Sequence, residues 1–250
     1  MTRRNERVQG RTMADTYDIK LPDPQPPLRV GMVLYPGLTA LDLIGPQSVL
    51  TAHATTYLLW KTRDLIMSDS GVPIQPTATF SDCPDDLDIL FVPGGMGTPD
   101  AMVDQEILRF LRDRGARSRY VTSVCTGSLI LAAAGLMQGY KATTHWSTRH
   151  ILEAFGVECV RARVVVDRNR ISGGGVTAGI DFGLTLLALL RGDDAAKLTQ
   201  LMLEYDPAPP FNAGVPEAAG PELTQRIVSV LDPYDQQMRK IAAERSNRAS

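Results

Sequence analysis

Short apolar runs, each about the length of one buried strand, alternate along the chain with segments of helical periodicity. Four runs are predicted as strands, at residues 28–35, 57–61, 88–92 and 119–124, and helices are predicted at residues 42–53, 101–115 and 126–137. Strands without polar alternation are typical of parallel sheets that are covered on both faces. Right-handed crossovers then give a doubly wound, mainly parallel, flavodoxin-like sheet. The predicted fold class is α/β, with a ligand site at the carboxyl ends of the strands.

Other segments depart from this alternation. Turn residues and two prolines in residues 66–80 predict a hairpin or edge excursion beside the sheet, and residues 163–172 predict an antiparallel pair around a tight turn. The most apolar stretch, residues 176–190, is too short to span a membrane and is predicted as a buried helix. A last helix is predicted from about Pro221 to Ala243, interrupted near Pro233.

The composition of the chain indicates which classes of binding partner and which cellular compartment to expect. The chain has 250 residues with 26 Lys and Arg against 28 Asp and Glu, so charge gives no reason to expect nucleic acid or a membrane surface as a partner. Three cysteines without a C-x-x-C pair indicate a reducing cytoplasm rather than disulfides or zinc. Residues 1–27 lack the apolar core of a secretory signal and are predicted to be a flexible arm before a single domain at 28–245.

Cys125 is the residue with the clearest chemical signature. It directly follows the predicted strand RYVTSV and directly precedes the predicted helix TGSLILAAAGLMQG, so it lies at a helix amino terminus. The helix dipole and free backbone N–H groups there favour a thiolate, which predicts a depressed thiol pKa and a strained backbone. Small neighbours such as Ser123 and Gly127 suit the sharp turn of a nucleophile elbow. A buried, inert cysteine is the alternative interpretation, and it is preferred for Cys83 and Cys159.

Five segments of the chain, taken together, carry a family resemblance. They are VTSVCTGSLILAAAGLMQGYKATTHW, FVPGGMGTPDAM, LYPGLTALDLIGP, ISGGGVTAGIDFGLTL and EYDPAPPFNAG. In these segments, over about residues 28–215, the chain resembles the isocyanide hydratases of the ThiJ/PfpI superfamily, which has the class I glutamine amidotransferase-like fold. The VCTGS and ATTHW segments also occur in relatives fused to DNA-binding regulators, whereas EYDPAPPFNAG is closer to the hydratases.

The resemblance implies two partners for Cys125. Asp42 matches the acidic residue beside the cysteine in the family, although by sequence alone it is first interpreted as the amino-terminal cap of the following helix. Thr126 stands where many peptidase-like relatives have His, so an adjacent Cys–His pair is missing and amide hydrolysis is disfavoured. By the resemblance, the amides of Gly95 and Thr126 form an anion hole that faces the cysteine.

The three histidines receive smaller roles. His145, in ATTHW, matches a family position near the cysteine and is a secondary candidate, with a hydrogen-bonded structural His as an equal alternative. His53 and His150 fall on predicted helices and are expected to be surface or packing residues.

The implied activity is hydration of an isocyanide to an N-substituted formamide by a hydro-lyase that uses cysteine covalent catalysis and needs no metal or organic cofactor. Two alternatives remain open at this point: another hydrolase or hydratase activity, of amidase or glyoxalase type, and a non-catalytic cysteine redox sensor. A homodimer is also expected, because the apolar residues Leu223, Ile227, Val230 and Leu231 exceed what a small capping helix needs.

Overall fold

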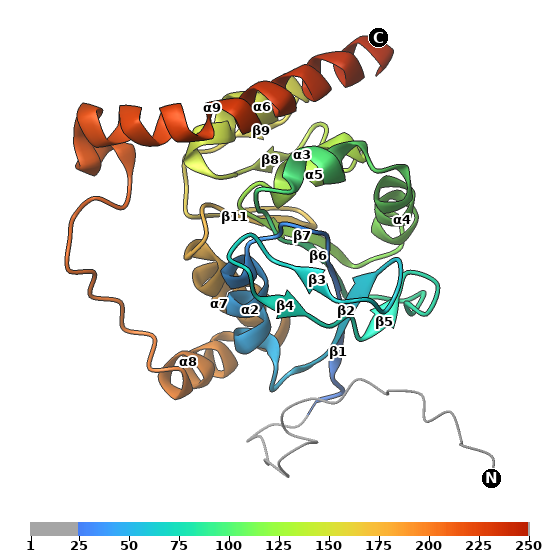
Figure 1. The fold of residues 1–250 in the computed structure, drawn as a ribbon. Helices are drawn as coiled ribbons and strands as arrows, with labels where there is room; N and C mark the ends of the chain where they lie inside the picture. Colours follow the sequence, from blue (N-terminus) through green and yellow to red (C-terminus); the bar gives the residue numbers. More distant parts are fainter. Residues whose placement is uncertain (1–24, 250) are drawn as a thin grey trace.

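The computed structural model describes residues 25–249, with side chains up to residue 245. A seven-stranded sheet in the order β10-β11-β7-β6-β1-β2-β5 forms its centre, and every neighbouring pair is parallel except β10 with β11. The strands are β1 (Leu28–Val33), β2 (Ala54–Trp60), β5 (Ala78–Thr79), β6 (Ile89–Val92), β7 (Tyr120–Val124), β10 (Val164–Asp167) and β11 (Arg170–Gly173). The predicted mainly parallel sheet is confirmed (Figure 1).

Helices cover both faces of this sheet (Figure 1). They are α2 (Ala40–Leu50), α3 (Thr98–Val103), α4 (Gln105–Gly115), α5 (Gly127–Ala133), η1 (Trp146–Thr148), α6 (Arg149–Ala154), α7 (Ala178–Arg191), α8 (Asp193–Met202) and α9 (Pro216–Ala249). Helices α2, α7 and α8 pack together on one face, whereas α3 to α6 and α9 pack together on the other. This is the doubly wound arrangement that parallel crossovers produce.

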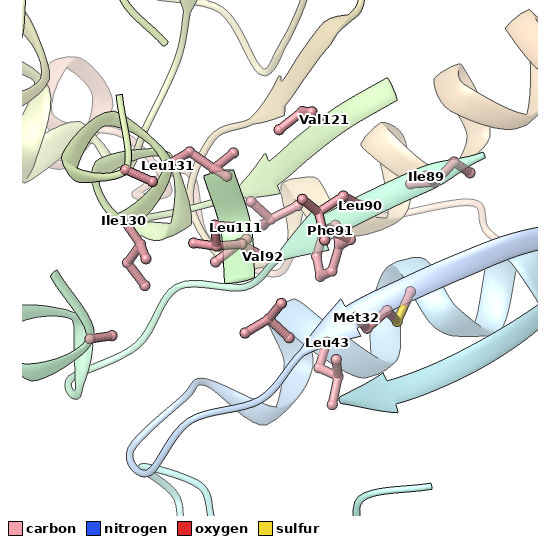
Figure 2. Close-up of a cluster of buried hydrophobic side chains, with 14 of the residues drawn as sticks. Met32, Leu43, Ile89, Leu90, Phe91, Val92, Leu111, Val121, Ile130 and Leu131 are labelled. Carbon is pink, nitrogen blue, oxygen red and sulfur yellow. The ribbon is translucent and has the colours of Figure 1, made fainter. Parts of the chain in front are cut away.

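The core lies on both sides of the central strand β6. Successive side chains of a strand point to opposite faces, and Phe91 accordingly packs against Phe182 of α7, with ring centroids 5.6 Å apart. Figure 2 shows the side chains of β6 between Leu111 and Ile130 of α4 and α5 and Leu43 of α2. Burial on both faces explains why these strands read as continuous apolar runs.

The two predicted excursions are present. Strands β3 (Ile66–Met67) and β4 (Pro73–Ile74) form an antiparallel pair, after which β5 adds to the edge of the main sheet beside β2. Strands β10 and β11 form the predicted antiparallel pair, and Arg168 in their turn has a φ of 54°. A further two-stranded sheet, β8 (Lys141–Ala142) with β9 (Glu158–Cys159), is parallel.

Two helices differ from their predictions. The helix predicted at residues 101–115 is divided at Asp104, whose extended backbone ends α3 and whose carboxylate accepts hydrogen bonds from the first amides of α4. Helix α9 is broken at Gly220, with a φ of 79°, and not near Pro233, where the helix continues. Pro233 is exposed, so its missing N–H bond and its ring are accommodated on the solvent side.

The two ends of the chain are described only in part. Gln25 and Pro26 accept hydrogen bonds from the guanidinium of Arg191 on α7, and residues 1–24 of the predicted arm lie outside the described residues. The single domain at 28–245 stays a prediction. Within the described residues, helices are either too short or too polar to cross a membrane.

Candidate active site

Cys125 occupies the turn between β7 and α5, at the carboxyl edge of the sheet. Its amide donates to the carbonyls of Gly174 (2.8 Å) and Gly173 (3.1 Å), and its carbonyl accepts from the hydroxyls of Thr144 (3.0 Å) and Ser128 (3.2 Å). These bonds hold Cys125 at a φ of 57°, a left-handed conformation that is strained for a residue with a side chain. The predicted backbone strain is confirmed.

Asp42 lies in the first turn of α2 and is completely buried. Its Oδ2 accepts a 2.9 Å hydrogen bond from the amide of Gly94, while within the described residues Oδ1 lacks a partner of regular hydrogen-bond geometry. The cap position of α2 belongs to Thr39, so Asp42 is not the helix cap that sequence alone suggested. The carboxyl instead interacts with the Cys125 thiol, and each side chain influences the pKa of the other.

Burial controls the protonation of this carboxyl. Removal from water disfavours the carboxylate and raises the pKa of Asp42 from 3.8 to about 7. The Gly94 amide and the Cys125 thiol, both acting as donors, oppose this shift in pKa but do not cancel it. Near neutral pH, Asp42 therefore exchanges a proton readily, as a general acid or base must.

The predicted depression of the Cys125 pKa is wrong. Cys125 is only 6% exposed, and burial together with the nearby Asp42 carboxylate raises the pKa of its thiol well above 9.0. Hydrogen bonds from the amide and hydroxyl of Thr126 lower the pKa, as expected at a helix amino terminus, but desolvation outweighs them. The resting residue is a thiol, and it needs a base to become a nucleophile.

Thr126 joins Cys125 to a small network of buried groups. Its hydroxyl accepts from the amide of Gly95 (3.1 Å) and lies 2.7 Å from the hydroxyl of Thr98. Thr98 is itself buried and donates to the carbonyl of Gly95 at 2.7 Å, while the hydroxyl of Tyr35 lies 3.4 Å from it. The Gly95 amide thus has an acceptor in the protein, and its part in an anion hole stays a prediction.

Gly94 allows the close approach of the two loops that carry Asp42 and Cys125. A Cβ atom on Gly94 would lie 2.5 Å from the amide nitrogen of Thr126 and 2.8 Å from Cβ of Cys125. Only glycine fits there, which brings the β6 loop against the cysteine turn. The sequence pointed to the neighbouring Gly95 and did not reveal that the amide of Gly94 holds Asp42.

His145 lines the same cavity as Cys125 without forming a catalytic dyad of regular geometry. Its Nδ1 lies 2.8 Å from the Ser147 hydroxyl and accepts from the Ser147 amide, so the ring caps η1. Burial and Arg149 lower the pKa of His145 to about 4, and the ring is neutral at physiological pH. Its role stays open between cap and site residue.

The other two histidines are surface or packing residues, as predicted, although α2 ends at Leu50 and leaves His53 in the following turn, while His150 is exposed on α6. Nε2 of His53 lies 3.4 Å from the Thr199 hydroxyl, and Nε2 of His150 accepts from Arg239 of α9 at 2.9 Å. Across residues 25–249, groups of three or more His, Cys, Asp or Glu side chains arranged to hold a metal ion are not found.

A cavity of about 680 Å³ opens above Cys125. The predicted residues Gly95, Cys125, Thr126 and His145 line it, whereas Asp42 lies behind the cysteine. Helix α9 supplies one wall through Leu223, Ile227, Leu231, Tyr234 and Met238. Three of these residues, Leu223, Ile227 and Leu231, were expected to form a dimer face. Their spacing indicates one apolar face of a helix, but it does not indicate which part of the protein that face contacts.

The sequence matches the DJ-1/PfpI family over residues 28–189, the part of the chain that carries Asp42, Gly95, Cys125 and His145. The chain belongs to the DJ-1/PfpI family. The described strand–cysteine–helix turn therefore lies within the region that the family shares.

Individual DJ-1/PfpI relatives differ in function. The chain is 50% identical to the isonitrile hydratase of Pseudomonas putida over 194 residues, which is 77% of this chain and 85% of that protein. It is 32% identical to the HTH-type transcriptional regulator GbdR of Pseudomonas aeruginosa over 153 residues, 59% of this chain and 41% of the regulator. The crystal structure of a ThiJ/PfpI family protein from Pseudomonas syringae superposes with a TM-score of 0.85 at 46% identity, over 91% of this chain and 99% of that one.

Proposed function

We propose that the protein is a cofactor-independent hydro-lyase that hydrates isocyanides to N-substituted formamides, with Cys125 as the covalent nucleophile and Asp42 as its acid and base. The observation that carries this proposal is the buried pair itself. A thiol that is protonated at rest lies beside a carboxyl with a pKa of about 7, at the base of a cavity. The 50% identity to the Pseudomonas putida isonitrile hydratase supports the choice of substrate.

The first step forms a carbon–sulfur bond. The Asp42 carboxylate takes the thiol proton as the sulfur of Cys125 attacks the terminal carbon of R–N≡C. The attack leaves an electron pair on that carbon, and the proton now on Asp42 is transferred to it. The product is a thioformimidate, R–N=CH–S–Cys125, and Asp42 is again a carboxylate.

The second step releases the formamide. The carboxylate of Asp42 removes a proton from water as the water oxygen adds to the thioformimidate carbon, and Asp42 passes that proton to the nitrogen. The carbon–sulfur bond then breaks as Asp42 takes the proton of the new hydroxyl group and passes it to the sulfur, which gives R–NH–CHO and the Cys125 thiol. One water is consumed for each isocyanide, and both the thiol and the carboxylate are restored.

The two alternatives fit the site less well. Amide hydrolysis by a Cys–His pair is disfavoured because Thr126 follows the cysteine and Nδ1 of His145 is bonded to Ser147. A redox sensor is disfavoured because a buried thiol with a raised pKa contains little of the reactive thiolate.

Incubation of the purified protein with benzyl isocyanide, and separately with hydrogen peroxide, tests the proposal. We expect catalytic formation of N-benzylformamide and slow oxidation of Cys125. Fast oxidation to a sulfenic acid without formamide would favour the sensor, and hydrolysis of an amide substrate without formamide would favour the hydrolase.

We also propose a cytoplasmic homodimer. The three cysteines at positions 83, 125 and 159 are free thiols, which suits a reducing compartment. Other large apolar side chains between residues 198 and 230 are exposed, among them Leu198, Leu201, Met202, Phe211 and Val230. Three of the four residues first expected to pair line the cavity instead, so these others are the proposed interface. A monomer mass by light scattering at micromolar concentration would contradict the dimer.

A further inference from the structure

One stripe of α9 faces the cavity above Cys125. Its members recur every three or four residues and are Leu223, Ile227, Leu231, Tyr234 and Met238. This spacing places them on a single helical face. The exposure of these side chains increases along the stripe. Met238 is buried, whereas Ile227 and Leu223 are each 47% exposed. The amino-terminal part of α9 thus presents unfilled apolar surface to the cavity.

The carboxyl-terminal part of α9 is fixed to the domain. Arg245 donates to the carbonyls of Ala133 (2.9 Å) and Met102 (3.0 Å), which end α5 and belong to α3. Asp235, which also lines the cavity, forms an ion pair with Arg239, and its Oδ1 lies 3.2 Å from Nε2 of His150 on α6. Figure 1 shows the amino-terminal part of α9 projecting beyond these helices. The wall is therefore the part of α9 that follows Gly220, and these contacts fix its carboxyl-terminal end to the domain.

The remaining walls of the cavity are also largely apolar. Met96 and Pro99 come from the β6 loop and α3, and Trp146 and Val176 come from η1 and the turn before α7. An isocyanide with its carbon at Cys125 would have its N-substituent in this cavity, because Cys125 lines it. The space available to that substituent is bounded by these side chains and the α9 stripe.

We infer that Ile227 and Leu231 are specificity-determining residues that contact the N-substituent and make bulky apolar isocyanides the preferred substrates. This inference rests on the proposed function. Contact between these side chains and a large apolar substituent removes apolar surface of both from water. A methyl group is too small to reach the side chains and bury this surface. Ile227 and Leu231 lie 102 and 106 positions after Cys125 in the sequence, so substitutions in α9 can change the preferred substrate without altering the reacting groups.

The test compares benzyl isocyanide with methyl isocyanide for the wild type and for Ile227→Ala, Leu231→Ala and the control Val228→Ala. Val228 is on the same helix but does not line the cavity. We expect Ile227→Ala and Leu231→Ala each to lower kcat/KM for benzyl isocyanide about fivefold or more, and for methyl isocyanide less than about twofold. Val228→Ala should leave the ratio of the two values unchanged.

A binding measurement separates this inference from the reaction itself. Trp146 lines the cavity, so its fluorescence reports binding of the product N-benzylformamide. We expect Ile227→Ala to weaken that binding by a factor similar to its effect on kcat/KM. Equal effects on both substrates, or unchanged binding of N-benzylformamide, would overturn the inference while hydration stands. A wild type that hydrates neither isocyanide would refute the proposed function, and the specificity inference with it.

Discussion

The amide of Gly94 donates a 2.9 Å hydrogen bond to Oδ2 of Asp42, although 52 residues separate them in the sequence. This bond joins the loop after β6 to the first turn of α2 and fixes the carboxyl behind Cys125. Because the bond is made to only one carboxyl oxygen, the other remains available to the thiol. Buried polar groups that lack a full set of partners are unusual, and such a group beside a nucleophile indicates a proton-transfer role.

Asp42 makes the stability of the protein depend on pH. The pKa of its carboxyl is about 7 in the folded protein and near 3.8 in the unfolded chain. Between these values the unfolded chain releases the proton that the folded protein keeps, so the free energy of unfolding falls as pH rises from about 4 to about 7. The shift of about three pKa units corresponds to at most about 4 kcal/mol.

Denaturant titrations of the wild type and Asp42→Asn at pH 4, 5.5, 7 and 8 check this dependence. The lowered pKa of His145, about 4, makes the free energy of unfolding rise with pH between pH 4 and 6.5. Both proteins contain His145, so this contribution cancels in their difference. We expect the wild type to lose stability relative to Asp42→Asn up to about pH 7 and then to keep a constant difference. A difference that does not vary with pH would show that the carboxyl has an ordinary pKa.

Thr98 is expected to position the Thr126 hydroxyl and the Gly95 peptide beside Cys125. Its hydroxyl is buried and lies 2.7 Å from both the Gly95 carbonyl and the Thr126 hydroxyl. Thr98→Val keeps the shape but removes these bonds, so we expect kcat to fall roughly tenfold with a smaller change in KM. Thr98→Ser should restore most of the activity, and failure of that rescue with a normal thermal unfolding curve would argue against a positioning role.

His145→Ala should leave most of the isocyanide hydration intact. The ring is neutral and caps η1 through Ser147, and in the proposed mechanism Asp42 makes the proton transfers. A loss within about threefold in kcat/KM is expected from disturbance of the cavity wall. Loss of activity comparable with that of Cys125→Ser would mean that His145 is part of a catalytic triad.

The order of strands and helices was accessible to sequence reasoning because both faces of the sheet are covered, which leaves long apolar runs. The points at which individual helices end or continue could not be predicted in this way. Asp104 ends one helix and begins the next through its own carboxylate, and the exposed Pro233 does not interrupt α9. Both outcomes depend on how a short segment meets its neighbours or the solvent, which periodicity does not record.

At the site, too, features made by neighbouring residues were predictable from the sequence, and features made by distant segments were not. The strand–helix turn at Cys125 was visible because neighbouring residues in sequence make it, and its φ of 57° follows. The thiol pKa was predicted in the wrong direction, since burial and the Asp42 carboxylate are contributions from distant segments. Thr98, the Gly94 amide and the α9 wall were missed for the same reason: each becomes a neighbour of Cys125 only after folding.

The most direct test of the account is steady-state formamide production by the wild type, Cys125→Ser and Asp42→Asn across pH 5 to 9. The carboxylate form of Asp42 must take the thiol proton, so wild-type kcat/KM should rise with pH through about 7 and then level off. The kcat/KM of Cys125→Ser should fall to the background rate, and the kcat/KM of Asp42→Asn should fall about 100-fold or more while the variant stays folded. Asp42→Asn with near wild-type kcat/KM and the same rise with pH would contradict the acid and base role of Asp42.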